Sequence, residues 1–265
     1  MGMKHIYLTE KNNWLLKITI PKKGVVCSDH DQAKRISKIL ERKKVYKNFY
    51  GQRVYCGYYK NNSLFISDTY IGSGAGLVFT ELFTAGAEYI IHYGIDIVKN
   101  FTEQEERLIK IIDETDNLYG FNLASGVHRN ECGQSVFASK KIIYALIEEA
   151  LCRSLKIEVR ICHHVENYHA FINIDKFSFE RKKRIQHIMQ KIKRFDKKES
   201  FNMESAILFR VAKDFDKHAA SVLQTIANQD NSMLSYNNDR QKKQLAINLE
   251  IDFAEYIFSA FLRTN

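Results

Sequence analysis

Apolar and polar positions alternate most informatively between residues 64 and 97. A run rich in β-forming residues comes first, then five small residues, a stretch with helical periodicity, a glycine and a second apolar run. The pattern predicts a strand at Leu64–Ile71, a tight turn at Gly72–Gly76, a helix at Leu77–Ala85 with Gly86 as its left-handed cap, and a strand at Glu88–Ile95. Such a βαβ unit implies parallel strands and a right-handed crossover.

The same patterns continue along the rest of the chain, while residues Phe101–Val136 favour no element. Helices are predicted at Lys140–Leu155, Ser205–Phe215 and Gln244–Leu262, and strands at Ile157–His163 and within Lys217–Ala227. Helices that alternate with buried strands predict an α/β fold, with a central twisted mixed sheet covered by helices on both faces. Only one proline, no low-complexity linker and no repeat interrupt the chain, so we expect one domain over residues 1–265.

The composition and the cysteines indicate the cellular compartment in which we expect the protein. With 45% hydrophobic and 12% aromatic residues, the 265-residue chain can fill a core without disulfides or metals. The five cysteines form no CxxC pair, no secretory signal is visible, and no apolar stretch is long enough to span a bilayer. We therefore expect a cytoplasmic protein with reduced thiols, and neither a membrane nor a nucleic-acid partner.

The net charge is +9, and its densest stretch is Arg181–Lys198. Apolar residues recur there at helical spacing, which predicts an amphipathic helix with one basic face. That face has two readings, a solvated surface or an anion-binding one. The other basic residues are spread along the chain, which argues against a nucleic-acid stripe.

Five short segments occur together in one order. They are His5 in KHIYL, Lys47-Asn48-Phe49 with Arg53, the glycine turn with Glu81-Leu82 and Ala85-Gly86, Phe201-Asn202-Met203-Glu204-Ser205-Ala206, and Thr225-Ile226-Ala227-Asn228. In this combination the chain resembles the nucleoside phosphorylase family over residues 4 to about 262. The Asn-Met-Glu-Ser and Thr-Ile-Ala-Asn segments are most similar to uridine phosphorylases. We prefer this interpretation of the glycine turn to a dinucleotide site, because the G-x-G-x-x-G register is absent.

The resemblance implies a ribose site. Glu204 would accept hydrogen bonds from ribose hydroxyls, Met203 would pack on the sugar, and His5 of a neighbouring subunit would reach the 5′-hydroxyl. Without the resemblance, Glu204 is an acid favoured by a helix N-terminus and His5 an ordinary surface histidine.

The phosphate site implied by the resemblance is degenerate. After the first strand, Ser28 stands at the position of a glycine in the family and Gln32 at the position of an arginine. Lys47 keeps a positive charge at its position, but it lacks the fork of hydrogen-bond donors that an arginine would present. His92, the catalytic candidate, replaces a second arginine, and Ile95 replaces a hydroxyl. Because this set lacks the guanidinium groups that offset desolvation of a dianion, we expect weak phosphate binding.

The base site and other ligands follow less directly. The resemblance suggests Phe171 for stacking and Asn173, Lys176 and Asn228 for polar contacts with a base. The histidines His163, His164 and His169 complete no metal-ligand spacing, so we expect no metal. We expect no cofactor either, with phosphate as a co-substrate if the protein is active.

Three functions therefore stay open. The first is phosphorolysis of a nucleoside, with uridine favoured, to the free base and ribose 1-phosphate. The second is an impaired family member that binds a nucleoside or serves as a regulatory or structural subunit beside an active paralogue. The third is a nucleoside hydrolase, for which Asp29, Asp68 or Asp96 would be the general base. In each case the resemblance implies a homodimer or hexamer.

Overall fold

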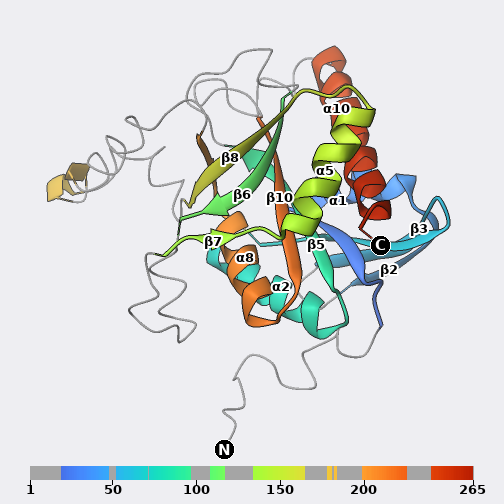
Figure 1. Ribbon diagram of the computed structural model, residues 1–265, viewed down its shortest axis with the longest axis horizontal. Helices are drawn as coiled ribbons and strands as arrows, with labels where there is room; N and C mark the ends of the chain where they lie inside the picture. Colours follow the sequence, from blue (N-terminus) through green and yellow to red (C-terminus); the bar gives the residue numbers. More distant parts are fainter. Residues whose placement is uncertain are drawn as a thin grey trace, which may run out of the picture.

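The computed structural model describes residues 19–47, 52–70, 72–96, 108–116, 134–164, 178–180, 182–183, 199–225 and 240–264. Ten strands of this part of the chain form one sheet in the order β2-β3-β4-β1-β5-β10-β6-β8-β9, with β7 paired to β6 (Figure 1). Their bounds are β1 Lys23–Cys27, β2 Glu41–Lys47, β3 Arg53–Tyr59, β4 Asn62–Asp68, β5 Tyr89–Asp96, β6 Ile109–Thr115, β7 Val136–Phe137, β8 Ile157–His164, β9 Glu199–Asn202 and β10 His218–Thr225.

The sheet is mixed, as predicted. Strands β4, β1, β5 and β10 run parallel, β10 and β6 pair antiparallel, and β6, β8 and β9 are again parallel. The carboxyl end of β9 lies close to β5, where the Asn202 side chain donates a hydrogen bond to the Ile95 carbonyl at 3.1 Å. Strands β5 and β9 are therefore in contact although three strands separate them in the strand order, and this part of the sheet is curled.

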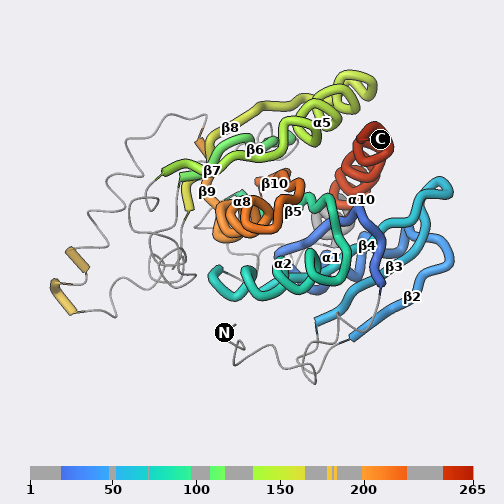
Figure 2. Tube along the Cα trace, turned by 60° about the horizontal axis from the view of Figure 1, so that its bottom comes forward, coloured from blue at the N-terminus to red at the C-terminus, as the bar shows by residue number. Residues whose placement is uncertain are grey.

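Helices cover both faces of the sheet, which confirms the predicted fold class (Figure 2). Their bounds are α1 His30–Ile36, α2 Ala75–Thr84, α5 Lys140–Cys152, α8 Ser205–Asp214 and α10 Arg240–Leu262. Helices α2 and α8 pack together on one face, and α5 and α10 pack together on the other. Helix α1 contacts α10, where Arg35 forms two hydrogen bonds with the Glu250 carboxylate, at 2.6 and 2.9 Å.

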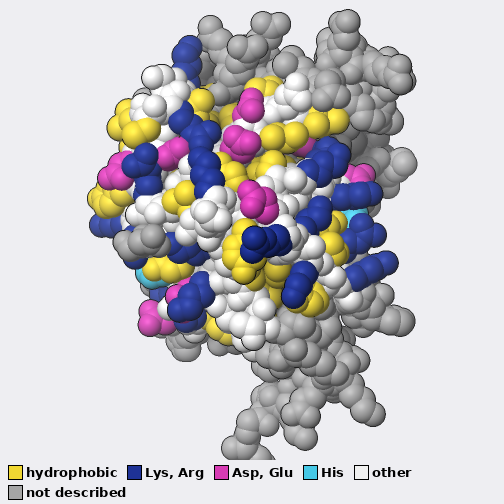
Figure 3. Space-filling model, turned by 90° about the vertical axis from the view of Figure 1, so that its right-hand side faces the viewer, with side chains coloured by type: hydrophobic (Ala, Val, Ile, Leu, Met, Phe, Trp, Pro, Cys, Tyr) yellow, Lys and Arg dark blue, Asp and Glu magenta, His cyan; other side chains and the backbone are white. Residues whose placement is uncertain are grey.

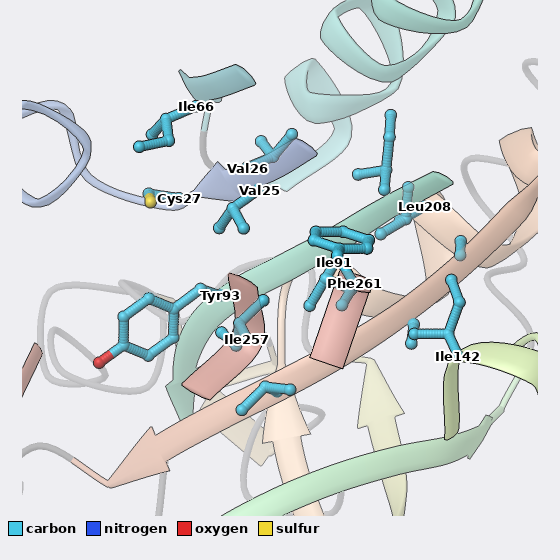
Figure 4. Close-up of a cluster of buried hydrophobic side chains, with 14 of the residues drawn as sticks. Val25, Val26, Cys27, Ile66, Ile91, Tyr93, Ile142, Leu208, Ile257 and Phe261 are labelled. Atoms are coloured by element: carbon cyan, nitrogen blue, oxygen red, sulfur yellow. The ribbon is translucent and has the colours of Figure 1, made fainter. Parts of the chain in front are cut away.

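Part of the core lies between α10 and the sheet (Figure 4). Ile91 and Tyr93 of β5 alternate with His92, so they face α10 while His92 faces the α2–α8 layer. Ile257 and Phe261 of α10 meet them, and all four side chains are fully buried. Each such side chain contributes about 1.5–3 kcal/mol by leaving water.

The predicted βαβ unit exists with two changes. Strands β4 and β5 are parallel, but β1 lies between them and pairs with both. The predicted turn is shorter, because residues Gly72–Gly74 form a 3-10 turn and Ala75 already belongs to α2. Gly86 has the expected positive φ, at 109°.

Figure 3 shows the side of the molecule where β2, β3 and α10 lie. Some Lys and Arg side chains lie there among apolar and acidic ones, and others lie close together along the right-hand edge of the described surface. Of the predicted helix Arg181–Lys198 only Lys182 and Lys183 are described. None of the helices in the described part of the chain combines the length and apolar character that crossing a bilayer requires.

Candidate active site

Four segments that are distant in the sequence meet at the carboxyl ends of the central strands. Ser28 follows β1, Gly72 opens the turn before α2, His92 lies on β5, and Glu204 follows β9. The carboxyl edge of parallel strands is where open α/β sheets bind ligands. We call the three side chains of Ser28, His92 and Glu204, which are joined by short contacts, the Ser28 cluster.

Glu204 is the buried acid of this cluster. Its Oε1 accepts a hydrogen bond from the Gly72 backbone N–H at 3.2 Å, and its Oε2 accepts one from the Ser28 hydroxyl at 3.4 Å. The residue is only 3% exposed. Burial raises the pKa of the Glu204 carboxyl to about 7, against the opposing effect of its hydrogen bonds. Near neutral pH this carboxyl can therefore be present in its protonated or its ionised form.

His92 lies beside it and is fully buried. Its Nε2 is 2.8 Å from Ser28 Oγ and 3.8 Å from Glu204 Oε2, and its Nδ1 is 3.5 Å from Ser221 Oγ on β10. Burial lowers the pKa of His92 to about 3, so the imidazole is neutral. The arrangement is not a Ser–His–acid triad, since the acid lies near the imidazole nitrogen that contacts the serine.

Gly94 makes room for the His92 ring. Both residues lie on β5 and, two positions apart, point to the same face. A Cβ atom on Gly94 would stand 2.2 Å from Cε1 of His92. Any side chain at position 94 would therefore push the imidazole away from Ser28.

The position of Glu204 depends on Asn202. The Asn202 Oδ1 atom accepts hydrogen bonds from the backbone N–H groups of Glu204 and Ser205, at 2.9 and 2.8 Å. Its Nδ2 donates to the Ile95 carbonyl on β5. One amide side chain thus connects the turn that carries Glu204 to the strand that carries His92.

Asp96 also connects β5 to β9, from inside the curled sheet. Its carboxylate accepts hydrogen bonds from the Phe201 backbone N–H at 2.9 Å and from the Ser200 hydroxyl at 3.1 Å. The Lys110 ammonium lies 2.7 Å from it, and the Arg160 guanidinium lies 3.8 Å away. All of these side chains except that of Phe201 are buried, and Lys110 also bonds the Thr225 hydroxyl.

The three carboxylates considered as general bases are engaged elsewhere. Asp96 takes part in the ion pair just described, and Asp29 caps α1 by accepting the Gln32 N–H at 2.8 Å. Asp68 contacts His30 Nδ1 at 2.5 Å and accepts the Arg53 N–H at 2.9 Å. The described contacts of these carboxylates do not include the Ser28 cluster, so none of the three fits the general-base role there; the carboxyl within the cluster is that of Glu204.

The structure brings together only part of the predicted phosphate set. Ser28 and His92 meet, but Gln32 is buried in α1 and its Oε1 has no hydrogen-bond partner among the described residues. Lys47 is exposed at the end of β2. Ile95 contributes its backbone carbonyl, which Asn202 occupies.

Of the other predicted site residues, Met203 is described by the structure and the rest are not. Met203 is half-buried between Asn202 and Glu204. The remaining predicted ribose and base residues, and one histidine, lie outside the described residues: His5, Phe171, Asn173, Lys176, Asn228 and His169. Among the residues that are described, no group of three or more His, Cys, Asp or Glu side chains is arranged to hold a metal ion.

Three residues of the site were missed by the sequence analysis. Asn202 was read only as part of a motif, and Gly94 and Ser221 were not considered. A glycine two positions after His92 was the available signal for close approach. Ser221 had no sequence signal, because only the pairing of β10 with β5 places it opposite His92.

Comparison with solved structures identifies the fold. The uridine phosphorylase of Vibrio fischeri, in complex with 6-hydroxy-1-naphthoic acid, is similar with a TM-score of 0.70 at 18% identity, covering 92% of both chains. The purine nucleoside phosphorylase of Toxoplasma gondii, in complex with immucillin-H, is similar with a TM-score of 0.69 at 14% identity, covering 99% of this chain and 98% of that one.

A nucleosidase has the same fold. The 5′-methylthioadenosine/S-adenosyl homocysteine nucleosidase of Campylobacter jejuni gives a TM-score of 0.66 at 13% identity, covering 91% of this chain and 98% of that one. No protein-family model matches the chain, and a search of curated protein sequences found no match. The fold is therefore the nucleoside phosphorylase fold, which both phosphorylases and nucleosidases adopt.

Proposed function

We propose that this protein binds a nucleoside and cleaves its N-glycosidic bond, with water as the acceptor of the ribosyl group. The observation that carries the proposal is the contact of the Glu204 carboxyl with the Gly72 turn and with the Ser28–His92 pair. This carboxyl would accept hydrogen bonds from the ribose hydroxyls. The similarity of Thr225–Asn228 to uridine phosphorylases makes uridine the first substrate to test.

The charge of the cluster favours water over phosphate. A dianion that leaves water needs positive charge nearby to offset the loss of hydration. Here the residue at the arginine position, His92, is neutral, and its neighbours are a hydroxyl and a carboxyl. A water molecule carries no charge, so a site made of such groups can hold it through hydrogen bonds alone.

The reaction balances without a cofactor. The bond between the anomeric carbon and the base nitrogen breaks, and the water oxygen bonds to that carbon. One proton of the water leaves with the base, so free ribose and free base are formed. Positive charge develops on the ribose in the transition state, and an ionised Glu204 beside the sugar would stabilise it.

Base release tests the proposal. Purified protein is incubated with uridine, inosine or adenosine, with and without phosphate, and the free base is separated by chromatography. We expect release that does not depend on phosphate. Release only with phosphate would show a phosphorylase, and binding without release would show a nucleoside-binding protein.

A matched pair of variants assigns the activity to the site. Glu204→Gln removes the carboxylate and should abolish release. Glu81→Gln is the control, because Glu81 on α2 is also buried and burial also raises its pKa to about 7, yet its position is outside the Ser28 cluster. Equal activity of the two variants would refute the site assignment.

A further inference from the structure

His164, the last residue of β8, has an unusual environment. Both of its ring nitrogens are shielded from water, and neither has a hydrogen-bond partner among the residues that the structure describes. A buried polar group without a partner is destabilising, and native structures contain few of them. The cost needs an explanation, and a ligand that satisfies the ring is one.

The register of the sheet places this ring near the Ser28 cluster. Side chains alternate along β8, so His164 points to the same face as Arg160 and Cys162, which are both buried. His164 pairs in register with Asn202, the residue that holds the Glu204 turn. The row formed by Arg160, Cys162 and His164 therefore ends at the edge of the sheet where Glu204 stands.

The thiol in the middle of the row supports this placement. The pKa of Cys162 is raised well above its usual value, first by burial and then by carboxylates that include Glu204. The effect of a charge weakens with distance. His164 is two residues further along the same face of β8 and pairs in register with Asn202, two residues before Glu204.

The end of β8 is held firmly. Asp116, which follows β6, accepts the His164 backbone N–H at 2.8 Å and lies 2.7 Å from Nδ1 of His163. His163 also approaches Glu199 of β9, at 3.4 Å. These contacts fix the backbone at His164, the position from which its ring projects.

We infer that His164 recognises the base of the nucleoside that Glu204 holds by the ribose, and that it decides which base is accepted. The inference rests on the proposed function. Burial lowers the pKa of His164 to about 4, so the ring is neutral near pH 7 and offers one N–H donor and one nitrogen acceptor. A carbonyl or a ring N–H of a nucleobase complements these two groups.

Three variants test the inference by calorimetric titration with uridine, inosine, adenosine and free ribose. His164→Leu should bind its preferred nucleoside about tenfold to a hundredfold more weakly, because one or two hydrogen bonds are lost. Its affinity for ribose should not change. His164→Gln, which keeps a donor and an acceptor, should restore part of the loss. Glu204→Gln should weaken ribose and nucleoside together.

A stability measurement separates recognition from structure. Because Leu removes an unsatisfied group from a shielded position, the melting temperature of His164→Leu should equal or exceed that of the native protein. His163→Leu, the control, loses its contacts with Asp116 and Glu199 and should melt lower.

The outcomes that overturn the inference differ from those that overturn the proposed function. Unchanged nucleoside affinity in His164→Leu, or an equal loss of ribose affinity, would refute the role of His164 and leave the proposed function standing. Native protein that binds ribose but no nucleoside would also refute it. Native protein that binds neither would refute both.

Discussion

At the scale of single residues, two effects compete at the Glu204 carboxyl. Burial disfavours its charged form, while the Gly72 N–H and the hydroxyl of Ser28 favour it, and burial is the larger effect. The result is an acid whose pKa of about 7 allows it to gain or lose a proton near neutral pH. Such a group is suited to a reaction in which charge develops nearby.

This shifted pKa predicts a pH dependence of stability. The folded pKa of Glu204 is above its ordinary value of 4.5, so its stabilising contribution is complete below pH 4.5 and is lost as the pH rises through 7. Relative to Glu204→Gln, the native protein should lose about 3 kcal/mol of unfolding free energy across this range, at about 1.4 kcal/mol per pKa unit. Urea unfolding of both proteins from pH 4.5 to 8 measures it. A constant difference would mean that the carboxyl is not shifted.

The close approach of the His92 ring to Gly94 predicts what a methyl group added at position 94 would do. Gly94→Ala should displace the imidazole from Ser28, lower stability by about 1–3 kcal/mol and weaken nucleoside binding, since the cluster is broken. Gly24→Ala is the control, because a Cβ there would stand 2.3 Å from the Phe65 ring in the core. The control should lose stability but keep its affinity per folded molecule. Equal effects on affinity would contradict the role given to Gly94.

At the scale of elements, the junction between β9 and α8 depends on the Asn202 side chain. Asn202→Ala leaves the buried N–H groups of Glu204 and Ser205 without their acceptor, so unfolding free energy should fall by about 2–4 kcal/mol. Asn202→Asp keeps the acceptor oxygen, and at a pH low enough to protonate the new carboxyl it can still donate to the Ile95 carbonyl, so it should be less harmful than Asn202→Ala there. Denaturant unfolding at that pH compares the two. Equal losses would show that the acceptor oxygen does not determine the stability of the turn.

The sequence predicted some of the buried elements well, although the mostly buried strand β6 lies in the stretch Phe101–Val136 that favoured no element. The predicted helix Ser205–Phe215 and the predicted strand Glu88–Ile95 agree with α8 and β5 to within one residue at each end. Strand β2 was missed, because its sequence ERKKVYK is exposed along nearly its whole length and shows no alternation. Charged residues on an edge strand discourage pairing with other chains, and the same property hides the strand from pattern analysis.

At the scale of the whole molecule, the Lys110–Asp96 ion pair connects strands across the interior of the curled sheet. Lys110→Met leaves the buried Asp96 carboxylate with only the more distant Arg160 guanidinium as a counter-charge among the described residues, so it should cost about 3–5 kcal/mol of unfolding free energy. The double variant Lys110→Met with Asp96→Asn should recover much of it, because asparagine can still accept the Phe201 N–H. Chemical denaturation measures both. A single variant that costs less than about 1 kcal/mol would contradict this role.

The order of the strands could not be predicted. Local periodicity indicates that β4 and β5 are strands, but it carries no information that β1 inserts between them. For the same reason Ser221 and His164 could not be assigned to a site, since their neighbours are set by the pairing of β10 and β9. The meeting of Ser28, His92 and Glu204 was predictable only because their surrounding motifs resemble a known family.

Because Ser28 and Ser221 are far apart in the sequence, His92 cannot have both as neighbours in a partly synthesised protein that stops before β10. A chain leaving the ribosome has to expose β10 before His92 acquires its last neighbour. Contacts so distant in sequence are also slow to form. A nucleoside that binds at the proposed site would therefore stabilise only chains that extend past β10.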